Sequence, residues 1–449
     1  MLAGIPPTRE VDVARLQAEM RDARARTLEL VAGLDDGQLI GPRLDIVNPM
    51  LWEIGHVAWF HEHFILQRAH GHAPLDARAQ SLYDSIAIHH EQRWDLPLLT
   101  RAETLEYMRR VHDALLERLA RVHTRGIADA VDSYLYRFTT FHEDMHDEAF
   151  TWTRQTLGYP TPDFATARVP GPAVDAHAGA LAGDVAVPGG EFLLGAPGDA
   201  PFVFDNEKWC HRVEVAPFRI ARAPVSNAEF AAFVADGGYA RRELWDAAGW
   251  QWCERSAARH PVYWQPDGAG GFAQRRFDRI VDLPPHQPVI HVNWYEARAW
   301  CRWAGRRLPR EFEWEVAALG EPAAGGSTLA DGKRRYPWGD AEPDALRAAN
   351  LDGRALGCVD VAALPAGDSA FGCRQMLGNV WEWCADAFTP YPGFVPDAYK
   401  EYSQTLFGHT RVLRGGAWIT RSRMITGLYR NYFGAERRDV FAGLRTCAC

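Results

Sequence analysis

Two kinds of sequence meet near residue 165, and the difference between them constrains the fold more than any other feature. Residues 1–165 contain 8 of the 39 glycines but 11 of the 17 histidines, whereas the remaining 284 residues contain 31 glycines and 13 of the 17 tryptophans. Few glycines and long periodic stretches indicate helices, while dense glycine and tryptophan indicate short strands joined by turns. We therefore expect an α+β protein of two domains, for which 449 residues are sufficient.

Amphipathic spacing predicts four helices in the first part of the chain. They lie near residues 10–34, 48–70, 102–124 and 128–157, and four such helices fit a four-helix bundle. The predicted bundle spans residues 1–160. A linker rich in proline, glycine and alanine follows over residues 161–185, and the second domain spans residues 186–449.

Composition excludes several classes of protein. The net charge of −9 argues against a nucleic-acid-binding protein. The sequence has no apolar run of 18 residues, so we expect no membrane span. The first 20 residues lack the basic and apolar regions of a signal peptide. The eight cysteines form no CxxC pair, which is typical of reduced thiols. We expect a cytoplasmic protein.

The most informative local motif is His142-Glu143-Asp144-Met145-His146. Histidines four residues apart lie on one helix face, close enough to share a metal ion. The string also satisfies the HExxH pattern of zinc hydrolases, but the continuation DEAFTWTRQ contains no third histidine. Structural histidines, a zinc hydrolase that uses Glu143, and another kind of metal centre all stay open at this point.

A third ligand is available upstream, in the mostly apolar segment 52–60. A histidine there needs a polar partner or a metal, because burial without one is costly. His56 would then join His142 and His146 on facing helices, with His61 and His63 as alternatives. Three imidazoles suit zinc, iron, copper or nickel, so the spacing leaves the metal undecided.

Both halves resemble known families. The first resembles DinB-type bundles, which carry a histidine on the second helix and HxxxH on the fourth. The second resembles the formylglycine-generating-enzyme (sulfatase-modifying factor) domain, a C-type-lectin-like fold. The matching strings are VPGGEF (187–192), PVIHVNW (288–294), RLPREFEWE (307–315), YPWG (336–339), GNVWEW (378–383) and LRGGAW (413–418).

Together, the two domains resemble the sulfoxide synthases of ergothioneine biosynthesis over nearly the whole chain. In that family, iron(II) held by three histidines uses O2 to couple a thiol to the imidazole carbon of hercynine (trimethylhistidine). The resemblance implies that His56, His142 and His146 hold Fe(2+). It also implies an active site between the bundle and the C-terminal part of the second domain.

The same resemblance implies a hercynine pocket built from two stretches, 383–394 and 430–438. Tyr391 and Tyr432 are expected to face the trimethylammonium group through cation–π contacts, and Asn431 to bind the carboxylate. Arg93 and Arg437 are candidate contacts to the donor.

The chain departs from the ergothioneine pattern at several positions. Phe388 stands where many sulfoxide synthases have a tyrosine that is a proton donor, so the proton donor stays unassigned. Phe433 stands where enzymes that use gamma-glutamylcysteine have an aspartate, and residues 83–97 replace a tyrosine-rich stretch. A site built for a charged donor would reject substitutes.

These departures favour the selenium branch of the family, selenoneine synthase, which joins a selenosugar to hercynine. The alternatives are a sulfoxide synthase that uses cysteine or gamma-glutamylcysteine, a zinc hydrolase that uses the HExxH of residues 142–146, and a module that only binds a ligand.

Overall fold

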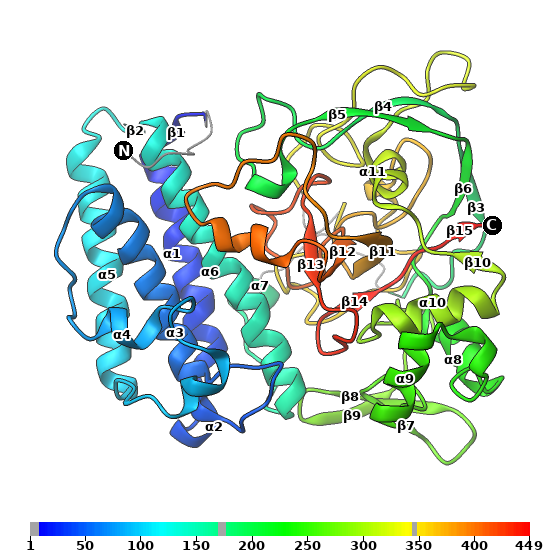
Figure 1. The fold of residues 1–449 in the computed structure, drawn as a ribbon, viewed down its shortest axis with the longest axis horizontal. Coiled ribbons are helices and arrows are strands. Elements are labelled where there is room, and N and C mark those ends of the chain that lie inside the picture. Colours follow the sequence, from blue (N-terminus) through cyan, green and yellow to red (C-terminus); the bar gives the residue numbers. More distant parts are fainter. Residues whose placement is uncertain (1–8, 169–176, 344–347) are drawn as a thin grey trace. The chain divides into compact units, whose positions relative to one another are not determined.

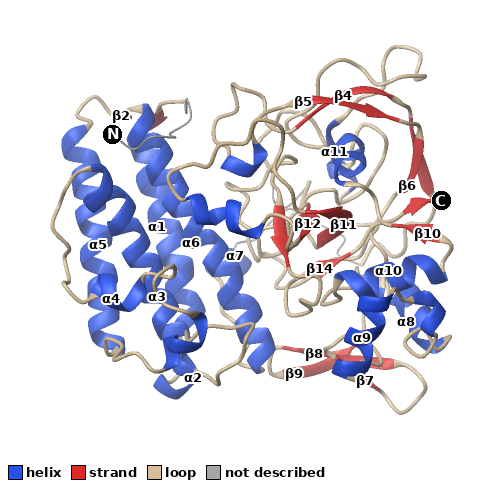
Figure 2. Ribbon diagram, in the orientation of Figure 1, coloured by secondary structure: helices blue, strands red, loops and turns tan. Residues whose placement is uncertain are grey.

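Long helices make up the first unit of the protein and short strands dominate the second, as Figures 1 and 2 show. The computed structural model describes residues 9–168, 177–343 and 348–449. Unit 1 comprises the chain up to Leu157 with Gly198–Asp205 and Val395–Ser403, and unit 2 comprises Gly158–Pro197, Asn206–Phe394 and Gln404–Cys449. The predicted α+β class, with a helical bundle followed by a mixed domain, is confirmed. Residues 169–176 of the predicted linker lie outside the described residues.

The long helices of unit 1 are α1, α3, α5 and α6, at the predicted places. Its elements are β1 (Val11–Asp12), α1 (Val13–Val31), α2 (Asp36–Ile40), α3 (Met50–His61), the π-helix η1 (Glu62–Ala69), α4 (Ala79–Tyr83), the 3-10 helix η2 (His90–Trp94), α5 (Arg101–Val122), β2 (Ile127–Ala128), α6 (Ala130–Leu157) and the 3-10 turn η6 (Lys400–Tyr402).

Side-chain caps set where two of these helices begin. The carboxylate of Asp12 accepts hydrogen bonds from the first backbone amides of α1. Thr100 and Glu103 form a capping box at the start of α5, which satisfies two amides that have no partner within the helix. α1 packs against α6, and α3 packs against both α5 and α6.

Helix α3 is buried along its whole length, from Met50 to His61. Its mostly apolar sequence explains this, because a helix that is hydrophobic on every side belongs in a core. The same burial forces its polar residues, Glu53, His56 and His61, to find partners on neighbouring helices.

Unit 2 is built from small sheets and short helices. Its helices are α7 (Ala165–Arg168), α8 (Asn227–Ala235), α9 (Ala247–Ser256), α10 (Trp294–Trp303) and α11 (Glu311–Leu319). Its short 3-10 turns are η4 (Arg242–Leu244), η5 (Pro365–Gly367) and η7 (Gln404–Leu406), and η3 (Asp205–Glu207) begins at the last residue of a unit 1 segment.

Two four-stranded sheets form the framework of unit 2. The first has the order β10 (Arg306–Arg307), β15 (Cys447–Ala448), β6 (Phe218–Ala221) and β3 (Asp184–Val187). The second has the order β13 (Asn431–Phe433), β12 (Arg411–Arg414), β11 (Trp381–Ala387) and β14 (Ala442–Gly443). All pairings are antiparallel except β11 with β14. The second sheet therefore brings Phe388, which follows β11, near the residues of β13.

The smaller sheets are β-hairpin-like. One pairs β4 (Gly190–Leu194) with β5 (His211–Val215), and the other has the order β7 (Trp264–Pro266), β8 (Phe272–Arg276) and β9 (Arg279–Asp282).

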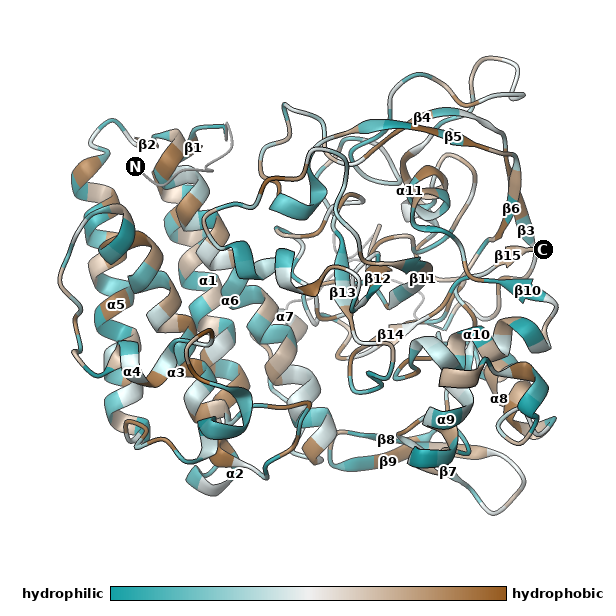
Figure 3. Cartoon of the chain, in the orientation of Figure 1, coloured by the Kyte–Doolittle hydropathy of each residue, from teal (hydrophilic) through white to brown (hydrophobic). Residues whose placement is uncertain are grey.

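Polar residues interrupt the long helices α1, α5 and α6, which Figure 3 shows as teal and white between the brown residues. In the part of the chain that the structure describes, no helix has the length and apolar character that a membrane crossing needs.

Gly55 lets the ring of Tyr83 pack directly on the backbone of α3. A Cβ atom at position 55 would lie 2.3 Å from two atoms of that ring. We expect Gly55→Ala to lower the free energy of unfolding by about 1–3 kcal/mol, since the ring must move. Chemical denaturation measures this.

Gly198→Ala is the control, because a Cβ atom there meets no atom within 4 Å. Helix propensity alone predicts that alanine at position 55 stabilises the protein. A Gly55→Ala variant as stable as the wild type would therefore show that the contact with Tyr83 is not a constraint.

Candidate metal centre

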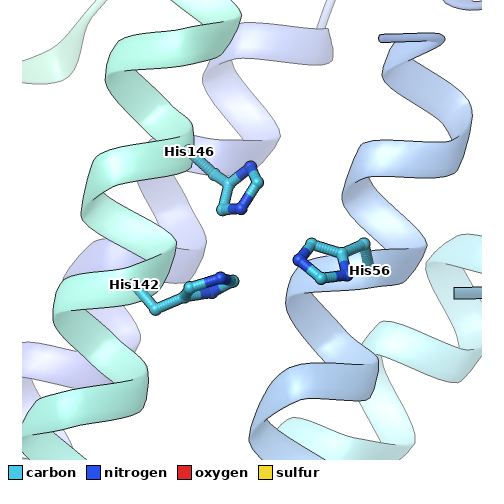
Figure 4. Close-up of side chains that lie close together, drawn as sticks. All are labelled: His56, His142 and His146. Atoms are coloured by element: carbon cyan, nitrogen blue, oxygen red, sulfur yellow. The ribbon is translucent and has the colours of Figure 1, made fainter. Parts of the chain in front are cut away.

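Three histidine side chains from two helices of unit 1 meet in one cluster. His56 comes from α3, and His142 and His146 come from successive turns of α6 (Figure 4). One nitrogen of each ring lies within 4.8 Å of the corresponding nitrogens of the other two. The group includes no carboxylate or thiol among the described residues. Three imidazoles at this separation suit a single transition-metal ion.

Hydrogen bonds fix the orientation of two of these rings. The Nδ1–H of His56 donates to the carbonyl oxygen of Tyr83 at 2.8 Å. His146 Nδ1 lies 2.6 Å from a carboxylate oxygen of Glu53, which is 1% exposed. In both rings, Nε2 is then the nitrogen left for a metal, as in the carboxylate–histidine–metal arrangements of known sites.

His142 has no hydrogen-bond partner among the described residues. Its Nδ1 is buried and forms no hydrogen bond. The ring of Phe60 stacks on it, with 3.5 Å between ring centroids. A buried imidazole without a polar partner is costly, and a bound metal ion would remove that cost.

Burial favours the uncharged form of His56 and His142. Burial, followed by the nearby His146, holds the pKa of His56 well below its usual value. Burial, followed by His146 and His56, does the same for the pKa of His142. Neutral imidazole is the form that binds a metal.

Glu143 points away from the histidine cluster. Its carboxylate accepts hydrogen bonds from Arg24 at 2.7 Å and Thr27 at 2.8 Å, and it lies 2.8 Å from His61 Nε2. Although burial opposes ionisation, Arg24 and His61 hold the pKa of Glu143 below its usual value. A carboxylate engaged in this way is not free to activate a metal-bound water, which argues against the zinc-hydrolase interpretation of the HExxH motif.

The two alternative histidine ligands do not reach the cluster. His61 faces Glu143, and His63 stacks on Trp59 with 4.8 Å between ring centroids. The α-helical spacing ends at His61, where the π-helix η1 begins. The ring of Trp59 also stacks on His56, with 5.8 Å between ring centroids, and His63 does not belong to the group of three histidines.

A second group of possible ligands, His123, Asp129 and Asp132, lies elsewhere in the bundle. Asp132 already pairs with Arg118 at 2.9 Å and with His123 at 2.6 Å. The positive charge of Arg118 beside Asp132 would repel a metal cation, so we assign no metal to this group.

Arg93 lies beside the histidine cluster. Its guanidinium stacks on Trp52 at 4.0 Å, and Trp52 in turn stacks on His56, with 4.9 Å between ring centroids. Arg93 donates to the side chain of Asn48 at 2.6 Å, but no carboxylate among the described residues pairs with it. Burial lowers its pKa. It is a cation with hydrogen-bonding capacity to spare near the cluster.

Two of the predicted substrate residues of unit 2, Phe388 and Tyr391, are buried. Phe388 is fully buried and stacks on Tyr432, with 4.1 Å between ring centroids. The guanidinium of Arg430 covers the ring of Tyr391 at 3.9 Å. Tyr391 therefore behaves as a core side chain and offers no open face to a trimethylammonium group, so we drop it from the expected contacts.

The other three predicted residues lie at the edge of the second sheet or just after it. Asn431 is half-buried, and its side-chain oxygen accepts the backbone N–H of Tyr432 at 2.8 Å. Arg437 lies 5.2 Å from the ring of Phe433 and forms a two-pronged ion pair with Asp439. The charge of Arg437 is thus already compensated, unlike that of Arg93.

Sequence reasoning missed the residues that orient the cluster. Glu53 precedes His56 by three residues in an apolar helix, and a buried carboxylate there was itself a signal that a partner exists. Tyr83 acts through its backbone carbonyl, which no side-chain pattern reveals. Tyr399 also contacts Phe60, with 5.3 Å between ring centroids, from a segment remote in sequence.

Glu53 should set the metal affinity of the cluster. We expect Glu53→Gln and Glu53→Ala to weaken binding of a divalent metal, measured with Co(II) by calorimetry, by about 10–100-fold, because His146 loses its anchoring carboxylate. Glu62→Gln is the matched control: Glu62 is fully buried and bonds to Tyr107 instead of a cluster histidine. Unchanged affinity in both Glu53 variants would contradict this role.

Glu143 should matter to folding more than to metal binding. Since Glu143→Gln leaves the buried Arg24 without a counter-charge, we expect the free energy of unfolding to fall by roughly 3 kcal/mol while metal stoichiometry is kept. Urea denaturation and metal analysis test the two parts. A variant with wild-type stability would contradict this structural role of Glu143.

Comparison with known proteins assigns both units. The DinB superfamily matches residues 19–150, and the Sulfatase-modifying factor enzyme 1-like domain matches residues 172–448. A hercynine oxygenase of Mycolicibacterium thermoresistibile is 39% identical over 96% of this chain and 94% of its own length. One from Mycobacterium tuberculosis is 38% identical over 96% of this chain and 98% of its own.

A formylglycine-generating enzyme of Streptomyces coelicolor is 34% identical, but it covers only 58% of this chain. The hercynine oxygenases, in contrast, match across both domains and nearly end to end. The chain therefore belongs to the hercynine oxygenase family, the ergothioneine-type sulfoxide synthases that join a DinB-type bundle to a sulfatase-modifying-factor domain.

Proposed function

We propose that this protein is an O2-dependent non-haem iron enzyme that joins the selenium of a selenosugar to the imidazole carbon of hercynine. The observation that carries the proposal is the buried cluster of His56, His142 and His146, in a chain of the hercynine oxygenase family. The cluster has the donor set of an iron site, and no protein group competes for His142.

The residues present fit iron(II). Tyr83 binds Nδ1 of His56, and Glu53 binds Nδ1 of His146. Nε2 of each ring is therefore left for the metal. Iron(II) held by the three histidines would supply the redox chemistry of the reaction. The nearby carboxylate of Glu53 lowers the net charge of the loaded site.

The chain's own residues position the reactants and keep water out. Phe60 and Trp52 cover two of the histidine rings with apolar surface. Arg93 offers N–H groups to a substrate oxygen at the edge of this surface. Contacts from Asn431, Tyr432, Phe433 and Phe388 stay predictions of the family resemblance, as does the active site between the domains.

Two substitutions favour selenium over sulfur in this proposal. Phe433 replaces the aspartate of enzymes that use gamma-glutamylcysteine, and Phe388 replaces the tyrosine that is a proton donor in many sulfoxide synthases. An apolar ring at position 433 cannot bind the charged end of that peptide, whereas a selenosugar carries no such charge.

One observation supports the second candidate, a sulfoxide synthase that uses cysteine or gamma-glutamylcysteine. The guanidinium of Arg93 has no carboxylate partner among the described residues, and its Nε is buried without a hydrogen bond. A carboxylate of a thiol donor would satisfy it. The choice between the two donors is therefore an experimental one.

The test compares donors on one preparation of protein loaded with Fe(II) without oxygen. Hercynine is supplied with a 1-selenosugar, cysteine or gamma-glutamylcysteine, and O2 uptake and product mass are followed. We expect a kcat/KM for the selenosugar at least tenfold above that for either thiol, because no charged donor contact is present at position 433. Protein loaded with zinc is the control and should consume no O2.

Each other outcome rejects a stated part of the proposal. A higher kcat/KM for a thiol would assign the chain to sulfur chemistry. No O2 uptake with any donor would reject the iron oxygenase itself, and turnover of zinc-loaded protein without O2 would restore the hydrolase.

A further inference from the structure

Unit 2 contains a cavity of about 750 Å³ whose walls are rich in arginine. Helix α10, strand β10 and the start of α11 supply most of the wall. Five arginines line it, namely Arg298, Arg302, Arg306, Arg307 and Arg310. This concentration is unexpected on a chain with a net charge of −9. Its volume falls in the range of small-molecule sites.

Three of these arginines already have carboxylate partners. Arg298 pairs with Asp246 at 2.5 Å, Arg306 with Asp184 at 2.7 Å, and Arg307 with Glu313 at 2.7 Å. These ion pairs build the wall and leave Glu214 as the lining carboxylate without an ion pair among the described residues.

Two cations beside Arg298 lack a carboxylate. Arg302 donates to the carbonyl oxygen of Leu244 at 3.2 Å and has no ion pair in the described chain. Arg411, from β12, is not a lining residue, but it stacks on the lining residue Trp294 at 4.1 Å and likewise pairs with no described carboxylate. Of Arg298, Arg302 and Arg411, Arg298 alone therefore has a carboxylate partner, Asp246.

The crowding of these three cations acts on the pKa of Arg298. Burial lowers the pKa of Arg298, and the positive charges of Arg302 and Arg411 lower it further against the opposing effect of Asp246. An anion bound beside Arg298 would offset this repulsion.

Trp294 holds two of the guanidinium groups in place. Arg298 lies 4.5 Å and Arg411 4.1 Å from the centroid of its ring. The ring itself is fixed, because its Nε1–H donates to the carbonyl oxygen of Cys384 at 2.9 Å. Groups fixed before binding lose little entropy when a ligand arrives.

We propose that this cavity binds a small phosphorylated molecule through Arg298 and Arg302 of its wall, with Arg411 as a further cation beside the wall residue Trp294. Arginine presents paired N–H donors that match phosphate oxygens, and three such groups suit a ligand with two or more negative charges. The cavity exceeds the size of a phosphate group, and Leu308, Phe312 and Ala385 line it with apolar surface for the organic part of a phosphate ester. The inference requires neither the metal nor hercynine.

Calorimetry on the full-length protein tests this, with inorganic pyrophosphate and ADP as probes at constant ionic strength. We expect one pyrophosphate site per chain. Arg302→Ala should weaken it at least tenfold, since Arg302 is exposed, so its loss should not disturb the fold. Arg411→Gln, which removes a charge beside the wall, should weaken it less than Arg302→Ala does. Arg255→Ala removes an equal charge from an exposed arginine outside the cavity and should change the affinity less than twofold.

Comparing the affinities for ADP and pyrophosphate distinguishes a phosphate ester from phosphoryl groups alone. Tighter binding of ADP than of pyrophosphate supports an ester whose organic part contacts the apolar wall, and equal or weaker binding supports the phosphoryl groups alone. The proposal is overturned if pyrophosphate does not saturate a single site at millimolar concentration. It is equally overturned if Arg302→Ala and Arg255→Ala weaken binding to the same extent.

Discussion

Burial of helix α3 is the constraint on which the site of unit 1 depends. Water cannot satisfy Glu53, His56 or His61, which are all at most 2% exposed, so each must find a partner inside the bundle. Glu53 finds His146, and His61 finds Glu143. His56 finds the carbonyl of Tyr83, and its remaining nitrogen is left facing His142 and His146. The partners that the buried polar residues of α3 need therefore also place the three histidines of the metal cluster together.

The HExxH motif is thereby divided between two tasks. Its histidines face α3 and form the cluster, while its glutamate faces α1 and closes an ion pair with Arg24. That ion pair is enclosed, with both side chains at most 8% exposed, and it ties α6 to α1. The same five residues would look identical in a hydrolase, and only the direction of Glu143 separates the two functions.

Local patterns predicted much of this but not the long-range contacts. The spacing of His142 and His146, together with one histidine in an apolar helix, predicted three residues that the structure brings together, and amphipathic spacing placed the long helices. The π-helix after His61 was not predictable, because its sequence also fits a continuous α-helix. The grouping of Val395–Ser403 with the bundle rests on contacts such as Tyr134 with Asp397, which are 263 residues apart and leave no local periodicity.

The prediction of which aromatic side chains are free to contact a substrate was the least accurate. Tyr391 was expected to receive a cation from the substrate, and it already receives Arg430 from its own chain. Sequence shows that an aromatic ring and an arginine are present but not that they stack on each other. The same holds for Phe388, whose neighbours include Tyr432 and Arg430.

The central claim, that His56, His142 and His146 together hold one iron, is tested most directly by anaerobic titration with Fe(II). The account predicts one tightly bound iron per chain in the wild type. It predicts loss of that iron in His142→Ala, while the control His112→Ala, which changes a histidine of α5 outside the cluster, keeps it. Circular dichroism should show all three proteins folded. Iron binding by folded His142→Ala at wild-type affinity would contradict the account.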